Sequence, residues 1–294
     1  MKNHTSICAA IIILFSSYAL AGTKQIINYP GATNTYATGI DGGKVVGFYS
    51  DSSGNSHGFI YDGTNWTPIN KAGVTNLEIS GIDGSNLIGT YDDSDGSHAF
   101  LYDGSTWTTI FSTLNTFPGP MWSPRSISGN NIVGNNNSYG SNLMVMYNIP
   151  TTTFSMLTQS AAWTAEGIEG DNIVGVYLVF SSSERTFIHH GFLYDGSTWN
   201  LLDVPGASRT DAYAIDGGNI IGTCQIGSSY YSFLYNGSSW TTFSFLSGMQ
   251  DMEGDKIVGF SSNGNTVQSY IYTIPEPCTL LLLGLGAAGF IRRR

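Results

Sequence analysis

The sequence contains very little cysteine: three residues in 294, of which only Cys224 lies away from the two ends of the chain. A domain with a single cysteine has no internal disulfide, so its stability depends on the packing of a hydrophobic core. Basic residues are also scarce. Without Lys2 and the three C-terminal arginines, residues 22–277 hold 7 basic (11 − 4) against 21 acidic side chains, a net charge of −14. Because a surface of that sign repels phosphate backbones, we expect no nucleic acid partner.

The middle of the chain also lacks helical periodicity. No apolar 3.6-residue repeat of useful length occurs between residues 22 and 274. P-loop, His-Glu-x-x-His and Cys-x-x-Cys patterns are missing as well, and most aspartates stand in turn sequences, so no catalytic carboxylate pair can be nominated. These absences favour an all-β domain and give no support for an enzyme.

Residues 1–21 have the composition of a secretory signal peptide. Lys2 precedes the apolar run 9–15, and the small residues Ala19 and Ala21 have the spacing of a cleavage site. We therefore predict cleavage after Ala21 and export of the remaining chain. The sequence then divides into a signal peptide at 1–21, a β domain at 22–274 and a C-terminal sorting segment at 275–294.

The β domain is repetitive. FLYDGSTW occurs at residues 100–107 and again at 192–199, and six apolar–apolar–Gly triplets are separated by 37 (259 − 222) to 47 (222 − 175) residues. The triplets end at Gly47, Gly89, Gly134, Gly175, Gly222 and Gly259. Each copy contains four short β-prone runs joined by Asp-Gly, Asn-Gly or Gly-Gly turns, which are strong hairpin markers. Four antiparallel strands with a period of ~40–45 residues indicate a β-propeller of six four-stranded repeats.

The ends of the repeat array predict how the ring closes. The sixth copy stops after residue 272 without its last strand, whereas an extra strand precedes the first copy. We predict that residues 25–29 pair with the strand around Tyr270–Thr273, which also removes an exposed sheet edge. Phe154 stands where the third copy should have its tryptophan. We further expect a bulky Tyr or Trp to lie over each triplet glycine, since glycine inside a strand leaves room for a close neighbour.

The repeat pattern is Gly-Ile-Asp-Gly-x-x-Val-Val-Gly followed by His-[Gly/Ala]-Phe-x-Tyr-Asp-Gly-x-x-Trp. It resembles the HAF-type extracellular repeats of exported bacterial proteins and covers nearly all of residues 33–272. The resemblance implies a repeat architecture and says hardly anything about chemistry.

The C-terminal segment has three parts in order: Pro275-Glu276-Pro277, the apolar residues 280–291, and Arg292-Arg293-Arg294. This arrangement closely resembles the PEP-CTERM sorting signal. The resemblance implies recognition by an exosortase, a membrane cysteine protease-transpeptidase, and coexistence with exopolysaccharide production in Gram-negative bacteria. A helix over 278–291 would span ~21 Å, short of the ~30 Å hydrocarbon core. We expect this short transmembrane helix to anchor the precursor transiently in the inner membrane, with the arginines in the cytoplasm.

Three histidines suggest a metal site. His57, His98 and His190 recur directly before the phenylalanine of the third strand, and three converging imidazoles bind zinc. Equivalent positions of different blades lie far apart, however, so hydrogen bonding at strand edges is the favoured interpretation. His189 and His190 beside Glu184 and Arg185 form a local cluster of ionisable groups, for which a solvated loop is favoured over catalysis.

Two turn sequences resemble known ligand boxes. Residues 92–96 suggest a calcium loop, but Tyr91 and Tyr102 stand where carboxylates are needed, so an acidic hairpin tip is favoured over a weak calcium site at Asp93 and Asp95. The Asp-Gly-Ser-Thr-Trp turns are similar to the Asp-box of sialidase-type propellers. The aromatic residues Trp107 and Trp199 follow the aspartate one position too early, so the turns are analogous and do not indicate sialidase activity.

Two functions remain open. The leading hypothesis is a non-enzymatic binding or structural propeller, without a cofactor, displayed at the cell surface or in the extracellular matrix of a biofilm and associated with polysaccharide. The alternative is a propeller hydrolase acting on matrix glycans. Fold alone does not separate them. Convergence of three or more acidic or histidine side chains at one mouth of the channel would favour the hydrolase.

Overall fold

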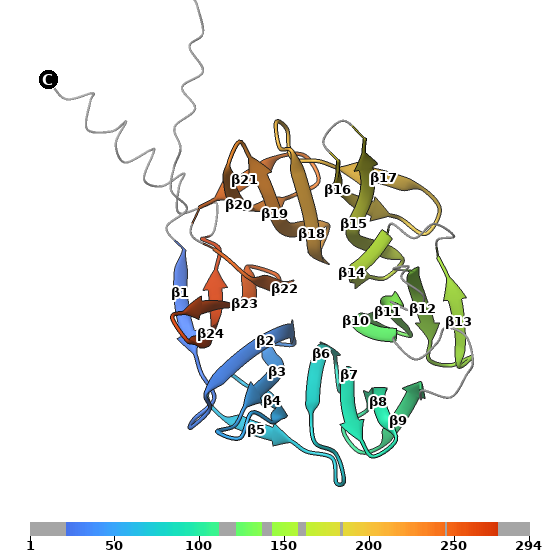
Figure 1. The fold of residues 1–294 in the computed structure, drawn as a ribbon, viewed down its shortest axis with the longest axis vertical. Helices are drawn as coiled ribbons and strands as arrows, with labels where there is room; N and C mark the ends of the chain where they lie inside the picture. Colours follow the sequence, from blue (N-terminus) through green and yellow to red (C-terminus); the bar gives the residue numbers. More distant parts are fainter. Residues whose placement is uncertain are drawn as a thin grey trace, which may run out of the picture.

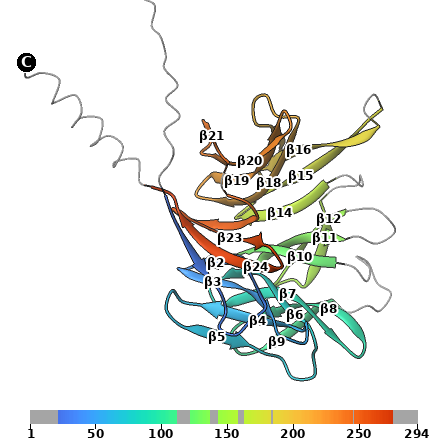
Figure 2. The same cartoon turned by 60° about the vertical axis from the view of Figure 1, so that its left-hand side comes forward.

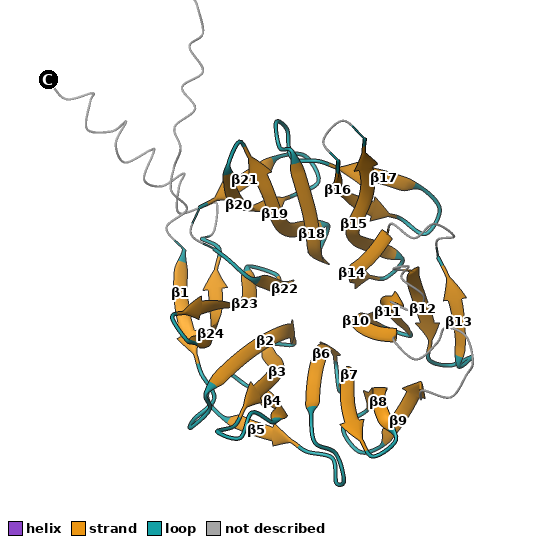
Figure 3. Ribbon diagram, in the orientation of Figure 1, coloured by secondary structure: helices purple, strands orange, loops and turns teal. Residues whose placement is uncertain are grey.

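The computed structural model describes residues 22–111, 122–136, 143–157, 163–182, 185–244 and 246–275. These residues form six four-stranded antiparallel sheets, the blades, arranged around a central axis (Figure 1). Figure 3 shows strands and loops over these ranges, and no helix within them is long and apolar enough to cross a membrane. The architecture is the predicted six-bladed propeller. The predicted signal peptide helix and the C-terminal transmembrane helix lie outside the described residues.

The first five blades are each built in chain order from the inside outward. Blade 1 contains β2 (Asn34–Asp41), β3 (Lys44–Ser50), β4 (Ser56–Tyr61) and β5 (Trp66–Ile69), and blade 2 contains β6 (Leu77–Asp83), β7 (Asn86–Asp93), β8 (Gly96–Tyr102) and β9 (Trp107–Phe111). Blade 3 contains β10 (Trp122–Ser128), β11 (Asn131–Asn136), β12 (Leu143–Asn148) and β13 (Thr153–Met156). Blade 4 contains β14 (Trp163–Glu169), β15 (Asn172–Ser181), β16 (Thr186–Tyr194) and β17 (Trp199–Leu202). Blade 5 contains β18 (Arg209–Asp216), β19 (Asn219–Ile226), β20 (Ser229–Tyr235) and β21 (Trp240–Phe243).

Blade 6 closes the ring with strands from both ends of the chain. It contains β22 (Met249–Glu253), β23 (Lys256–Asn263), β24 (Thr266–Thr273) and β1 (Thr23–Ile27), in the spatial order β22-β23-β24-β1. The predicted closure is therefore confirmed, with one correction to the register. Residues 23–27, rather than 25–29, pair with 269–273, because the strand ends before the turn at Pro30 and Gly31.

The repeated octapeptide is a structural unit, the end of a third strand and its turn into the fourth. In blade 2 the Tyr102 hydroxyl donates to the Gly104 carbonyl at 2.8 Å, and Asp103 Oδ1 accepts backbone N–H groups from Ser105 and Thr106. Gly104 has a φ of 95°, a backbone conformation that residues with a side chain rarely adopt. The ring of Trp107 then stacks on Tyr102 at 4.4 Å. The turn therefore requires Tyr-Asp-Gly and the following tryptophan together.

The core consists of clusters between neighbouring blades. Between blades 6 and 1, for example, Ile27 and Val258 pack against Phe59 and Tyr61. In blade 3 the ring of Phe154 lies 4.8 Å from Tyr147, its partner across the sheet, so phenylalanine occupies the place of tryptophan as predicted. Apolar packing between blades, without disulfides, holds the described part of the ring together.

Each innermost strand contains a β-bulge, in which one residue has no partner on the second strand. The bulges lie at Thr38, Ser80, Arg125, Glu166, Tyr213 and Gln250. Our prediction that a bulky Tyr or Trp lies over each triplet glycine is wrong, because the nearest neighbour is the backbone next to the bulge. A Cβ on Gly89 would collide first with the backbone carbonyl of Glu78, and an aromatic ring follows as a close neighbour only at Gly175, Gly222 and Gly259. The bulge turns a carbonyl of the innermost strand toward the glycine, which explains why the residue must be small.

The two faces of the ring carry different connections. Turns between first and second strands (such as 41–44) and between third and fourth strands (such as 62–65) lie on one side, which we call the turn face. Hairpins between second and third strands (such as 51–55) and the links between blades lie on the other side, the hairpin face. Because successive strands are antiparallel, blades 1–5 present the same connections to the same face, and in blade 6 the two described chain ends take the place of the turn between third and fourth strands.

Candidate functional site in the central channel

The six bulged residues, one from each blade, line a cavity of about 220 Å³ in the central channel. The cavity is lined by Thr38, Ser80, Arg125, Glu166, Tyr213 and Gln250. A bulge re-aims the side chain of its extra residue, and six equivalent bulges aim six side chains at one cavity. The result is a ring of hydroxyl, amide, guanidinium and carboxylate groups, with no aliphatic side chain among the six.

Arg125 and Glu166 form an ion pair across two blades of this ring. Arg125 Nε lies 2.9 Å and Nη2 2.8 Å from Glu166 Oε2. The Glu166 side chain is 16% exposed and that of Arg125 47% exposed. Burial raises the pKa of Glu166, and the Arg125 guanidinium opposes that rise. The ion pair fixes the positions of the guanidinium and the carboxylate at the cavity wall.

A ring of hydrogen bonds between blades surrounds the channel at the turn face. The last residue of each innermost strand accepts a backbone N–H from the glycine turn of the next blade, for example Gly84 N to Asp41 Oδ2 at 2.7 Å. The six pairs are Asp41–Gly84, Asp83–Gly129, Ser128–Gly170, Glu169–Gly217, Asp216–Gly254 and Glu253–Gly42. Charge-assisted bonds of this kind explain why the repeat carries Asp or Glu before its turn glycine.

These six hydrogen-bonded pairs, which we call the clasp ring, bear on the hydrolase hypothesis. Carboxylates do gather at one mouth of the channel, since Asp41, Asp83, Glu169 and Asp216 line it together with Asp251. Each of the clasp carboxylates is bonded to a backbone N–H of the next blade, which is a structural role. Within the described ranges no group of three or more His, Cys, Asp or Glu side chains is placed to hold a metal ion.

Asp251 adds a carboxylate to the junction of the last and first blades. Its Oδ2 accepts the Ile40 N–H and its Oδ1 the Met252 N–H, both at 2.9 Å. Burial, with a smaller effect of the carboxylates of Asp216 and Asp41, raises the pKa of Asp251 to about 7 from the usual 3.8. The residues at this position in the other blades are Gly39, Gly81, Ser126, Gly167 and Ala214.

We expect Asp251→Asn to be more stable relative to the original protein at pH 8 than at pH 4. A raised pKa means that the folded protein binds the proton more tightly, so this stabilisation is complete below pH ~4 and is lost as the pH rises through about 7. Each pKa unit corresponds to about 1.4 kcal/mol, so between pH 4 and pH 8 the variant should gain ~2–4 kcal/mol relative to the original protein. Asparagine has one acceptor oxygen for the two N–H groups that Asp251 binds, and the comparison of two pH values cancels that pH-independent loss. Thermal melts at both pH values measure the difference, with Asp255→Asn, exposed in the next turn, as control. A difference in melting temperature between the variant and the original protein that is the same at both pH values would contradict the raised pKa of Asp251.

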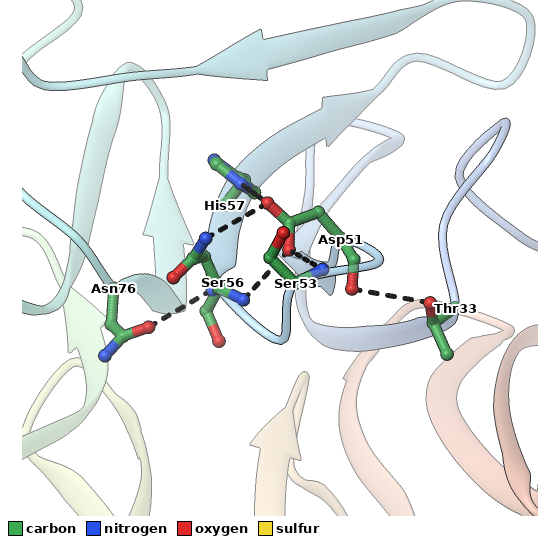
Figure 4. Close-up of polar contacts among 7 residues, drawn as sticks. Thr33, Asp51, Ser53, Ser56, His57 and Asn76 are labelled. Carbon is green, nitrogen blue, oxygen red and sulfur yellow. Dashed lines mark hydrogen bonds and ion pairs between the residues drawn. The ribbon is translucent and has the colours of Figure 1, made fainter.

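The predicted histidines do not converge. His57 Nε2 lies 3.0 Å from Asp51 Oδ2, and His98 Nε2 lies 2.7 Å from Asp93 Oδ1. Figure 4 shows that Asp51 also accepts the Ser53 N–H, at 2.8 Å, so the pair braces the hairpin tip of blade 1. His190 likewise pairs with an aspartate of its own blade. The interpretation as hydrogen-bonding groups is supported over a shared zinc site.

The cluster predicted around His189 and His190 has different members. His189 Nδ1 lies 2.7 Å from Asp211 Oδ1, and Arg209 Nε lies 2.6 Å from Asp211 Oδ2. Asp211 is 4% exposed and belongs to blade 5, whereas His189 belongs to blade 4. Glu184 lies outside the described residues. The sequence did not reveal this bridge, because its partners are 22 residues apart on different blades.

One further sequence pattern is explained by the structure. Residues 54–58 read Gly-Asn-Ser-His-Gly, the spacing of a hydrolase nucleophile elbow, which requires a strand-to-helix turn. Here the segment enters strand β4, and the Ser56 hydroxyl donates to Glu78 Oε1 at 3.1 Å while His57 pairs with Asp51. Since successive strand residues point to opposite faces, Ser56 and His57 do not form a catalytic pair.

The acidic hairpin tip of blade 2 is ordered by its own backbone. Asp93 Oδ1 accepts the Asp95 N–H at 2.8 Å in addition to its contact with His98. A weak calcium site at Asp93 and Asp95 stays a prediction. Of the predicted processing residues, Pro275 is the last one described; Ala19, Ala21, Glu276, Pro277, Arg292, Arg293 and Arg294 lie outside the described residues.

Comparisons with solved structures show the propeller fold. The β-propeller domain of the Trilobed protease from Pyrococcus furiosus, described as having an open velcro topology, is 8% identical with a TM-score of 0.53, and the match covers 83% of this chain and 97% of that domain. A putative TolB from Agrobacterium tumefaciens is 12% identical with a TM-score of 0.51, over 83% and 90% of the two chains. An acylaminoacyl peptidase is 12% identical with a TM-score of 0.54, over 86% and 46%.

The comparisons with sequences concern the C-terminal segment. No curated protein matches the chain. Residues 273–294 match the PEP-CTERM protein-sorting motif, as predicted from Pro-Glu-Pro, the apolar stretch and the arginines. This motif marks an exported protein that an exosortase recognises and processes at the membrane. The chain is thus a six-bladed β-propeller followed directly by a PEP-CTERM sorting motif.

Proposed function

We propose that the protein is a non-enzymatic binding propeller, displayed after processing at the cell surface or in the extracellular matrix, that takes a hydroxyl-rich ligand such as a sugar residue into its central channel. The observation that carries this proposal is the convergence of six bulged side chains, one per blade, on one polar cavity. The resemblance to HAF-type extracellular repeats and to a sorting signal that accompanies exopolysaccharide production supports a matrix glycan as the source.

The chemistry of the cavity favours a neutral polyol over an ion. Arg125 and Glu166 neutralise each other, and Gln250 adds an amide that both donates and accepts. Hydroxyl groups also donate and accept, so a sugar matches such a ring. The net charge of −14 over residues 22–277 disfavours polyanionic polymers.

The test is a glycan-array screen of the purified full-length protein in detergent, followed by titration of the best ligand. We expect the double variant Arg125→Met, Glu166→Gln to bind at least about tenfold more weakly, because hydrogen bonds to charged groups contribute ~1.5–3 kcal/mol. Arg185→Met, at an exposed hairpin tip outside the channel, is the matched control and should bind as the original protein does. Unchanged affinity in the double variant would refute the channel as the binding site.

A hydrolase acting on matrix glycans is the second candidate, favoured by the raised pKa of Glu166, which suits a general acid. It predicts release of reducing ends from the bound glycan, and loss of that release in Glu166→Gln. Binding without any product over long incubation supports the non-enzymatic function instead.

A further inference from the structure

Both described ends of the chain leave the propeller at one point of the turn face. Thr23 at the start of β1 pairs with Thr273 at the end of β24, and Thr273 also pairs with Lys256 at the start of β23. These three residues form one row across blade 6, beside the turn that joins β22 to β23. Figure 2 shows the chain ends leaving on one side and the hairpins of β7–β8 and β15–β16 projecting on the other.

The connection between this row and the sorting motif is short. From Thr273 to Pro277 there are four residues, and from Thr273 to the start of the apolar stretch at Leu280 there are seven. At most ~3.6 Å per residue, these spans reach about 14 Å and 25 Å. Strands of eight residues, such as β2 and β7, give the propeller a thickness of about 26 Å at ~3.3 Å per residue. A tether of that length does not reach around the ring to its other face.

We infer that the anchored precursor holds its turn face against the bilayer and presents its hairpin face to the surroundings. The inference rests on the membrane anchoring that we expect of the C-terminal segment. The clasp ring then faces the membrane. The hairpin tips stand about 25 Å farther out, where a matrix polymer meets the protein first.

Exposed hydrophobic side chains on the hairpin face would favour the opposite orientation. Five of the eight exposed large hydrophobic side chains of the described residues lie at the hairpin tips of blades 4 and 5: Val179, Phe180, Phe187, Ile226 and Tyr230. Phe180 and Phe187 form a T-shaped pair at 5.3 Å, each 56% exposed. Exposed aromatic tips are typical of segments that dip into a membrane interface. The tether predicts that they point away from it.

The experiment measures energy transfer from a dye on the full-length precursor to a rhodamine-labelled lipid in membranes. Donor sites are Thr64→Cys on the turn face and Ser53→Cys on the hairpin face, two exposed positions of blade 1. Cys8 and Cys278 are replaced by serine, and Cys224, 1% exposed, stays unlabelled. We expect clearly stronger transfer from the Thr64 site, as for two planes ~25 Å apart.

The outcomes distinguish a failure of the inferred orientation from a failure of the membrane anchoring on which it rests. Equal transfer from both sites, or stronger transfer from the Ser53 site, overturns the inference while the anchoring stands. Recovery of the precursor outside the membrane fraction overturns the anchoring, and the inferred orientation with it. Repeating the measurement with Phe180→Ser, Phe187→Ser distinguishes the alternative: if the tips enter the bilayer, this variant loses the Ser53 signal.

Discussion

Deletion of residues 22–31 is expected to lower the melting temperature by at least about 10 °C or to leave the protein unfolded. The deletion removes β1, the outer strand of blade 6, and exposes the paired edge of residues 269–273. It also removes Ile27, 4% exposed in the core between blades 6 and 1, and Tyr29, whose ring stacks on Tyr49 at 3.7 Å. Burial of one large apolar side chain contributes ~1.5–3 kcal/mol, so the two side chains together account for ~3–6 kcal/mol before the lost strand pairing is added.

Calorimetry of the full-length and shortened proteins measures this effect. The matched control is Gln25→Ala, an exposed side chain of the same strand, which should leave the melting temperature within ~1–2 °C. A synthetic peptide of residues 22–31 should restore stability to the shortened protein in a concentration-dependent manner, because it binds only the folded ring. Identical melting temperatures for the two proteins would show that β1 does not close the ring.

Gly89→Ala is expected to destabilise the protein by more than ~3 kcal/mol, the upper end of ordinary overpacking. The added Cβ would overlap the carbonyl of Glu78 and lie 2.9 Å from the Cα of Ile79. Both are backbone atoms of the innermost strand, so no side chain can move aside. In a domain of this size, 3 kcal/mol corresponds to a drop of about 6–12 °C.

Thr90→Ala, the next residue along β7, is the control for Gly89→Ala, since it removes atoms and adds none. The same glycine at the other five triplets meets a carbonyl in the same way, so Gly134→Ala should behave similarly. A Gly89→Ala protein that melts like the control would mean that the innermost strand lies farther from the second strand than the structure indicates.

Much of the fold could be predicted from local sequence. The turn glycines require positive φ, and the Tyr-Asp-Gly turns contain their own hydrogen bonds, so short segments define hairpins without help from the rest of the chain. Six copies with a propeller-like period then imply six blades, and the strand missing at one end matches the strand added at the other. The sorting motif could be recognised for the same reason: Pro275 and the residues after it carry the pattern in sequence order.

The channel site could not be predicted in this way. Arg125 and Glu166 are 41 residues apart and meet because both occupy bulges at the same height in neighbouring blades. A bulge interrupts the two-residue alternation of a strand, so alternation alone assigns these side chains to the wrong face. The triplet glycines were misinterpreted for the same reason, since the carbonyl that crowds Gly89 turns toward it only at the bulge.

The sequence by itself thus determined the sorting motif, the number of blades and the closure of the ring, because each depends on residues that are neighbours in the chain or on their period. The tertiary structure alone decided which side chains share the channel, which carboxylates bond to the next blade, and that both ends of the described chain, Thr23 and Thr273, lie on the turn face. These properties depend on how six sheets pack around an axis, where residues about 40 positions apart become neighbours. No local pattern encodes that packing, because it arises from the fit between blades.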